Sequence, residues 1–143
     1  MRADGRGRAC RASTSSDADL SDAVLREAYL QNARLTGIDL SFSDLTLVDL
    51  RGAVGLTVQH LQSATSLVGL NVSGLVLAGA EFSGRNLIAV QFVNTNLRGA
   101  NLSGAILTAA NFTGADLTGA DLRGADLTAA RCPNGSHTTL GVC

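Results

Sequence analysis

Residues 115–129 read Ala-Asp-Leu-Thr-Gly, Ala-Asp-Leu-Arg-Gly and Ala-Asp-Leu-Thr-Ala, the same five-residue unit three times in succession. Leucine stands at the centre of each unit, and alanine stands two residues before it. The centres continue upstream through Leu67, Val72 and Leu77, and the series ends at Cys132. A second block, with leucine at every fifth residue from 20 to 50, has the same period in another register. The repeat is therefore interrupted between these two blocks.

A period of five excludes both common secondary structures as the continuous element. A helix repeats its apolar residues every 3.6 positions, and a strand repeats them every 2. The pattern fits a coil that turns a corner once per five residues, with one large and one small side chain pointing inward and glycine easing the corner. Stacked coils would bond to one another as parallel strands about 4.8 Å apart, which makes a β-solenoid. The predicted core is Leu87, Phe92, Leu97, Leu102, Leu107, Phe112, Leu117, Leu122 and Leu127.

The Ala-(Asp/Asn)-Leu-x-x units of residues 18–52 and 65–132 resemble the pentapeptide repeat proteins. The resemblance implies an all-β fold, a right-handed quadrilateral parallel β-helix with four pentapeptides per coil. Residues 20 apart would then stack, which predicts that Phe92 packs on Phe112. Twenty-one repeats make about five coils, and we expect a rod about 25 Å tall from the strand spacing.

The chain divides into three predicted parts. Residues 1–16 form a flexible arginine-containing leader, residues 17–132 form one solenoid, and residues 133–143 form a C-terminal tail. The solenoid has a first register at 17–52, an interruption at 53–64 and a second register at 65–132. Within the interruption, Thr57 is a fair N-cap, and Val58, Leu61 and Ala64 follow at spacings of three, which predicts a short helix. This helix either joins the two registers or serves as a recognition element.

Arg85 occupies a position that the repeat assigns to a small inward side chain. A guanidinium without partners inside the solenoid would be very costly. We expect a local distortion that turns Arg85 outward.

Composition and charge exclude several classes of protein. With 45% hydrophobic and 16% charged residues, most of the chain is not disordered. The net charge is −1, and no concentrated basic face is apparent, so direct binding to nucleic acid is not expected. The most apolar stretch, residues 66–80, is shorter than a membrane span and is interrupted by polar residues. No signal peptide is recognisable, and we expect a cytoplasmic location, while the pair Cys132 and Cys143 leaves an extracytoplasmic location open.

No constellation of residues points to catalysis. His60 and His137 are joined by no motif to a nucleophile or an acid, and the cysteines and histidines lack the short spacing of a metal site. The glycines recur at corners rather than in a phosphate-binding loop. We therefore expect no enzyme activity, no catalytic residues, no metal and no cofactor.

Two pairs of residues are candidate features. A disulfide between Cys132 and Cys143 would pin the tail across the open end of the last coil, whereas a cytosolic chain would keep both thiols reduced. Phe42 and Leu47 stand two residues after their centres, where the solenoid faces solvent. They form a candidate contact patch, although scattered exposed apolar residues are normal.

These features favour a non-enzymatic, rigid module that binds an unidentified protein partner or acts as a scaffold, with a homodimer through an end or a face of the solenoid as a further possibility. The resemblance implies an alternative: a DNA mimic that binds DNA gyrase or topoisomerase, inhibiting it or protecting it from quinolones. Mimicry needs rows of stacked carboxylates. Asp116 and Asp121 would stack on Asn96 and Asn101, so no acidic ladder is predicted in the last coils. A structural cap without independent activity is a third class.

Overall fold

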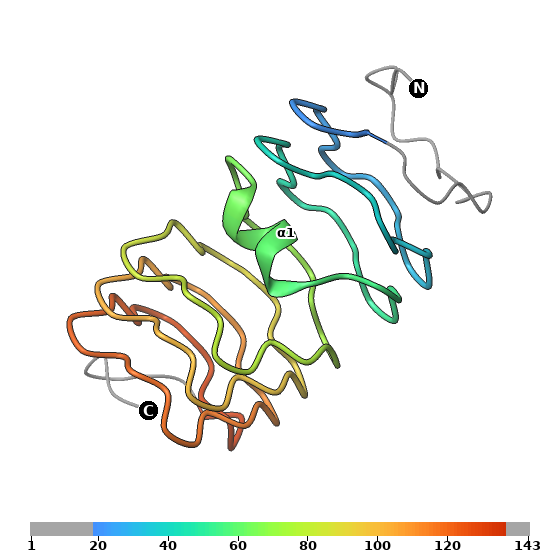
Figure 1. Cartoon of the computed structure of the whole chain (residues 1–143). Coiled ribbons are helices and arrows are strands. Elements are labelled where there is room, and N and C mark those ends of the chain that lie inside the picture. Colours follow the sequence, from blue (N-terminus) through green and yellow to red (C-terminus); the bar gives the residue numbers. More distant parts are fainter. Residues whose placement is uncertain (1–18, 137–143) are drawn as a thin grey trace.

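The computed structural model describes residues 19–136, which form a stack of coils with the first and last described coils at opposite ends (Figure 1). Residues 20 apart lie side by side in parallel, as in the pairs of Val76 with Asn96 and of Asn96 with Asp116. The pairs are isolated bridges because each side of a coil extends for few residues before the next corner. The one helix of residues 19–136 is α1, Val58–Ser63.

Backbone hydrogen bonds hold each coil to the next in a fixed pattern. The Leu97 N–H donates to the Asp116 carbonyl at 2.9 Å, and the Asp116 N–H donates to the Thr95 carbonyl at 3.0 Å. The Ala100 N–H closes the corner by donating to the Leu97 carbonyl at 3.0 Å. The predicted stacking of residues 20 apart is therefore confirmed within each register. Across the interruption the paired residues are 22 apart, as in Asp44 with Ser66 and Asp49 with Asn71.

We name the four sides of the stack after the residues that they hold in the second coil: the Asp39, Asp44, Asp49 and Val54 sides. The column on the Asp49 side runs without a break through all the described coils. Its members are Tyr29, Asp49, Asn71, Gln91, Asn111 and Arg131. Five coil spacings of about 4.8 Å give this column a length of about 24 Å.

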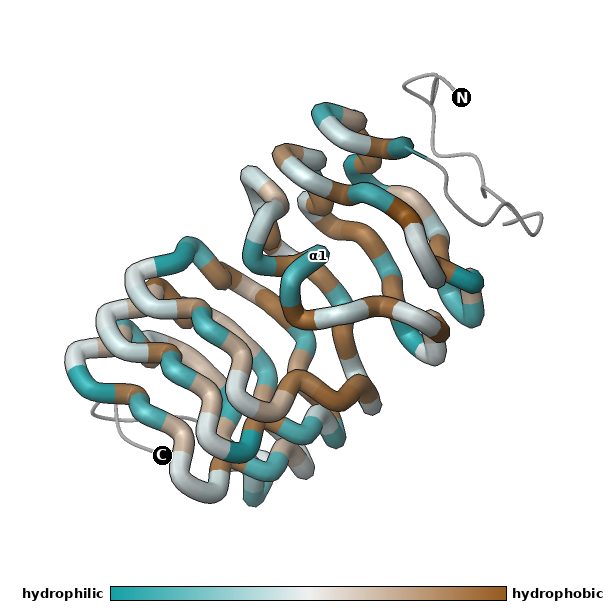
Figure 2. Tube along the Cα trace, viewed as in Figure 1, coloured by the Kyte–Doolittle hydropathy of each residue, from teal (hydrophilic) through white to brown (hydrophobic). Residues whose placement is uncertain are grey.

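Apolar side chains fill the inside of the stack, and along the tube of Figure 2 apolar and polar positions alternate around each coil. Among the predicted core residues, Leu117 and Leu122 are only partly buried. The predicted stacking of Phe92 on Phe112 is confirmed, with ring centroids 5.2 Å apart and ring planes 8° from parallel. The other predicted core residues are buried: Leu87, Phe92, Leu97, Leu102, Leu107, Phe112 and Leu127.

Helix α1 takes the place of the Asp39 side in the third coil, and Figure 1 shows it between the first coils and the later ones. Leu61 is 1% exposed, so the helix contributes an apolar side chain to the core besides joining the two registers. At its N-terminus, the Thr57 N–H donates to Nδ1 of His60 at 3.0 Å. His60 therefore satisfies a backbone donor at the start of the helix.

The expectation that a local distortion turns Arg85 outward is wrong. The corner at Arg85 keeps the regular bond, from the Arg85 N–H to the Phe82 carbonyl at 3.1 Å. Its half-buried guanidinium donates to the carbonyls of Gln62 at 2.8 Å and Ala64 at 2.7 Å. These carbonyls lie at the C-terminal end of α1, where a helix leaves its last carbonyls without intrahelical donors. Arg85 is tolerated because the interruption supplies acceptors for its charge.

Candidate protein-docking surface

The outward carboxylates and amides close the corners of the coils. Oδ1 of Asp116 accepts the backbone N–H of Thr118 at 3.0 Å and its hydroxyl at 2.5 Å. Oδ1 of Asn111 accepts the same two groups of Thr113, at 3.1 Å and 2.7 Å. This arrangement recurs along the stack and explains why the repeat places aspartate or asparagine before each leucine.

Arginines pair with several of these aspartates at the surface. The ion pairs join Arg26 to Asp44 at 2.5 Å, Arg51 to Asp49 at 2.7 Å, Arg98 to Asp116 at 3.2 Å and Arg123 to Asp121 at 2.6 Å. Exposed pairs of this kind contribute little to stability, but each one removes a free negative charge from the outer face.

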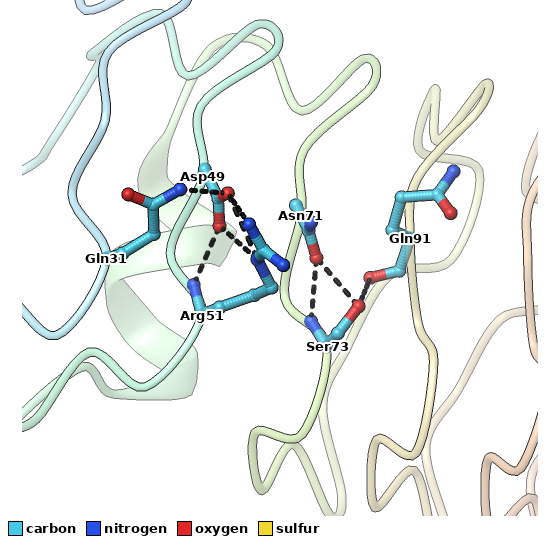
Figure 3. A network of polar contacts seen from close by, with 6 residues as sticks. All are labelled: Gln31, Asp49, Arg51, Asn71, Ser73 and Gln91. Carbon is cyan, nitrogen blue, oxygen red and sulfur yellow. Dashed lines mark hydrogen bonds and ion pairs between the residues drawn. The ribbon is translucent and has the colours of Figure 1, made fainter.

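Figure 3 shows one such polar network on the Asp49 side. The carboxylate of Asp49 accepts hydrogen bonds from Gln31, in the coil before it, at 2.5 Å, and from the Arg51 guanidinium at 2.7 Å. In the next coil, Asn71 accepts the hydroxyl of Ser73 at 2.7 Å. These side chains bond to one another, so this side offers few unsatisfied polar groups to a ligand.

The bonded carboxylates have lowered pKa values. Hydrogen bonds from the Arg123 side chain, and then from its backbone N–H, lower the pKa of Asp121 to about 2. Hydrogen bonds from the hydroxyl and the backbone N–H of Thr118 lower the pKa of Asp116. The ionised forms of both carboxylates are therefore favoured by folding.

We expect the stability of the protein to fall as the pH drops from about 4 toward 2. The pKa of Asp121 lies near 3.9 in the unfolded chain and at about 2 in the folded protein. The stabilisation that the ionised Asp121 gives the fold is therefore complete above about pH 4 and is lost as the pH falls toward 2. Urea midpoints at pH 7, 4 and 2.5 measure this loss. Asp121→Asn, which keeps an oxygen acceptor, should show a smaller loss; an equal loss would contradict the assignment.

Large exposed apolar side chains are concentrated in the first two coils. Within residues 19–136, the later coils add only Val76, 72% exposed, and Ile106, 40% exposed. The first two coils hold Val24 at 64%, Tyr29 at 56%, Phe42 at 65%, Leu47 at 53% and Val54 at 58%. The candidate contact residues Phe42 and Leu47 are therefore both more than half exposed.

Val24, Phe42 and Leu47 surround one side of the second coil, and we call them the apolar patch. Phe42 and Leu47 occupy the two corners that border the Asp44 side, and Val24 pairs with Asp44 across the coils. Leu47 leans over Gly69 of the next coil, where a Cβ atom would collide with the leucine side chain. The patch therefore consists of the Asp44 side and its two bordering corners.

Sequence reasoning found two of the three patch residues. Val24 was missed because it stands immediately before a core centre, in a position that usually holds aspartate or asparagine. Aligning the first block coil by coil would have placed Val24 above Asp44, between the two corners.

Residues 19–136 contain no group of three or more His, Cys, Asp or Glu side chains that could hold a metal ion. Cys132 is buried at the last core position and is disulfide-bonded. Cys143 and His137 lie outside the described residues, so Cys143 as the partner of Cys132 stays a prediction. Over the same described range, no helix has the length and apolar character needed to cross a bilayer.

Comparisons with known proteins agree with the repeat. The family model for pentapeptide repeats matches residues 16–54 and 91–128, with eight copies. A search of curated proteins found no match.

Among solved structures, the pentapeptide repeat protein Rfr23 from the cyanobacterium Cyanothece 51142 is 34% identical over 68% of this chain and 58% of its own, with a TM-score of 0.41. HetL from Nostoc sp. strain PCC 7120, involved in regulating heterocyst differentiation, is 28% identical. The match covers 86% of this chain and 69% of HetL, with a TM-score of 0.32. QnrB1, a plasmid-mediated fluoroquinolone resistance protein, is 20% identical. The match covers 87% of this chain and 63% of QnrB1, with a TM-score of 0.46. The match to Rfr23 thus spans less than two thirds of that protein. The chain belongs to the pentapeptide repeat family, whose members fold as right-handed quadrilateral β-helices.

Proposed function

We propose that this protein is a non-enzymatic binding module, a rigid stack of coils that presents one side to a protein partner. Two features support the proposal. The outward aspartates and asparagines are bonded into the corners, as Asp116 and Asn111 illustrate. The exposed apolar side chains, in contrast, gather in the first two coils.

The observation that carries the proposal is the backbone conformation of Phe42 and Leu47. Their φ angles are +59° and +58°, in the left-handed region, which costs an ordinary residue about 1 kcal/mol. Burial does not offset this cost, because both side chains are more than half exposed. The same corners of the other coils hold glycine, alanine or an acidic residue, and none holds another large apolar side chain. In the Phe42 column these are Asp22, Gly84, Gly104 and Gly124, and in the Leu47 column they are Glu27, Gly69, Ala89, Ala109 and Ala129.

The fold therefore does not need a phenylalanine or a leucine at these corners, and contact with a partner explains why they are there.

Photo-cross-linking from each side of the stack tests the proposal. A photoreactive amino acid would replace, one at a time, Val24 on the Asp44 side, Tyr29 on the Asp49 side, Val76 on the Val54 side and Ser83 on the Asp39 side. In a lysate of the source cell, we expect irradiation to link one protein reproducibly from one side and not from the opposite one. Failure to link any protein from all four sides would contradict a protein-binding function.

DNA mimicry is the second candidate, because Asp19, Asp39, Glu81 and Asp121 share the Asp39 side. The density of charge argues against it. Four carboxylates along five coil spacings of about 4.8 Å give about one charge per 6 Å, whereas duplex DNA carries one per about 1.7 Å. Asp121 is also paired with Arg123.

We accordingly expect the purified protein, even in large molar excess, neither to inhibit supercoiling by DNA gyrase nor to protect the enzyme from a quinolone. Inhibition that Asp39→Asn weakens would favour mimicry instead.

A further inference from the structure

We infer that the apolar patch binds a basic amphipathic segment of a partner protein, one that carries lysine or arginine beside large aliphatic anchors. This inference rests on the proposed protein-binding function and adds the chemistry of the partner.

The shape of the patch provides the anchoring part. Val24 and Asp44 are bridged across neighbouring coils, about 4.8 Å apart, and Phe42 and Leu47 stand at the corners on either side of Asp44. The carboxylate of Asp44 accepts Nε of Arg26 at 2.5 Å and the hydroxyl of Thr46 at 2.5 Å. The polar group at the centre of the patch is thus already satisfied, and the apolar side chains around it are free to contact a partner.

The rim of the patch provides the charge. Asp22 and Glu27 are the corner residues of the first coil, one full coil before Phe42 and Leu47 respectively. Their N–H groups donate to the second coil, at the residues just before Phe42 and Leu47, which places each acid next to one apolar corner. Both acids are exposed, and neither makes an ion pair within residues 19–136.

Arg26, which lies between Asp22 and Glu27 in the sequence, does not neutralise these two acids. Arg26 is held by Asp44, so Asp22 and Glu27 keep their negative charges beside the apolar corners. A complementary partner would place its own cations there, which would raise its association rate and fix its orientation.

The later coils lack this combination. On the Asp44 side they hold Ser66, Asn86, Ile106 and Asp126, and the corners on either side carry only glycine or alanine, with no large apolar side chain. The binding surface is therefore confined to the first two coils.

Three synthetic peptides of equal length serve as probes against the full chain, with fluorescence anisotropy as the measurement. One combines leucine with arginine, the second leucine with glutamate, and the third serine with arginine. We expect the leucine–arginine peptide to bind the full chain most tightly, because it alone matches both the apolar corners and the acidic rim.

Phe42→Gly/Leu47→Gly is the decisive variant. Glycine suits the left-handed corners, so the variant should remain folded, while its affinity for the leucine–arginine peptide should fall about tenfold or more. Asp22→Asn/Glu27→Gln should weaken binding about threefold and reduce its salt dependence. Val76→Ser/Ile106→Ser, which removes exposed apolar side chains elsewhere, should bind like the wild type.

Three results would overturn the inference: equal binding of the leucine–glutamate peptide, unchanged binding by the glycine variant, or no binding of the leucine–arginine peptide up to its solubility limit. Cross-linking distinguishes this failure from that of the proposed function. A partner linked only through Tyr29, Val76 or Ser83 would overturn the assignment of the patch and leave protein binding intact.

Discussion

Leu107→Lys is expected to unfold the coil stack, whereas Ile106→Lys, one residue earlier, is expected to leave it folded. Leu107 is completely buried, while Ile106 is 40% exposed. The substitution at 107 removes the burial of a leucine, worth about 2–3 kcal/mol, and places an ammonium group in the column of Leu87 and Leu127. An unpaired buried charge costs several kcal/mol more, out of a total stability of about 5–15 kcal/mol.

Circular dichroism and thermal unfolding of the two lysine variants measure this difference. Both variants introduce lysine into the same coil, so a difference in their unfolding temperatures reflects the burial of the replaced side chain rather than the intrinsic propensity of lysine. Similar unfolding temperatures for the two variants would contradict the assignment of alternate residues to the inside and the outside of the stack.

Arg85→Ala is expected to lower the free energy of unfolding by about 2 kcal/mol and to loosen α1. It removes the two hydrogen bonds from the guanidinium to the carbonyls of Gln62 and Ala64. Hydrogen bonds from charged donors contribute about 1.5–3 kcal/mol each, and partial exposure of the guanidinium reduces that figure here. The destabilisation should be greatest in the interruption, because both acceptor carbonyls belong to it.

Urea unfolding and limited proteolysis together measure the effect of Arg85→Ala. We expect new cleavage within residues 55–65 while the later coils stay protected. Arg98→Ala is the matched control, because Arg98 forms an exposed ion pair with Asp116 and its loss should destabilise the protein much less. Equal losses in the two variants would show that Arg85 does not hold the helix.

The regular part of the fold could be predicted from the sequence because each five-residue unit repeats one local structure. The stacking of Phe92 on Phe112 follows from their separation by one full coil, and the ring geometry confirms it. The short helix follows from the N-cap Thr57 and the apolar residues after it, and the structure has it at Val58–Ser63. Local patterns were sufficient in both cases.

The partners of the irregular residues could not be predicted in the same way. The sequence shows that Arg85 stands in an inward position, but not that the end of α1 brings two carbonyls within its reach. The repeat likewise gives Leu117 and Leu122 the same position as Leu127, yet the first two are only partly buried and Leu127 is buried. Such features depend on contacts across coils, which a single unit does not encode.

The chemistry of the candidate surface was partly visible in the sequence. Phe42 and Leu47 stand out because they replace the usual glycine, asparagine or alanine at a corner. The position of Asp22 and Glu27 beside the apolar patch appears only when successive coils are aligned one above the other. That Arg26 leaves the charges of these two acids uncancelled depends on its ion pair with Asp44, which the structure shows.

The stacking register, in which four pentapeptides complete one coil, is the claim on which the core, the corners and the apolar patch all depend, and a pair of cysteines tests it directly. Val76→Cys/Asn96→Cys places two outward thiols on bridged residues of neighbouring coils, at a spacing of about 4.8 Å that a disulfide can span. Val76→Cys/Asn86→Cys is the control, because its thiols lie closer in sequence but on opposite sides of the stack. Under mild oxidation, peptide mapping by mass spectrometry should find the 76–96 link and no 76–86 link; a 76–86 link that forms as readily, or no 76–96 link, would contradict the register.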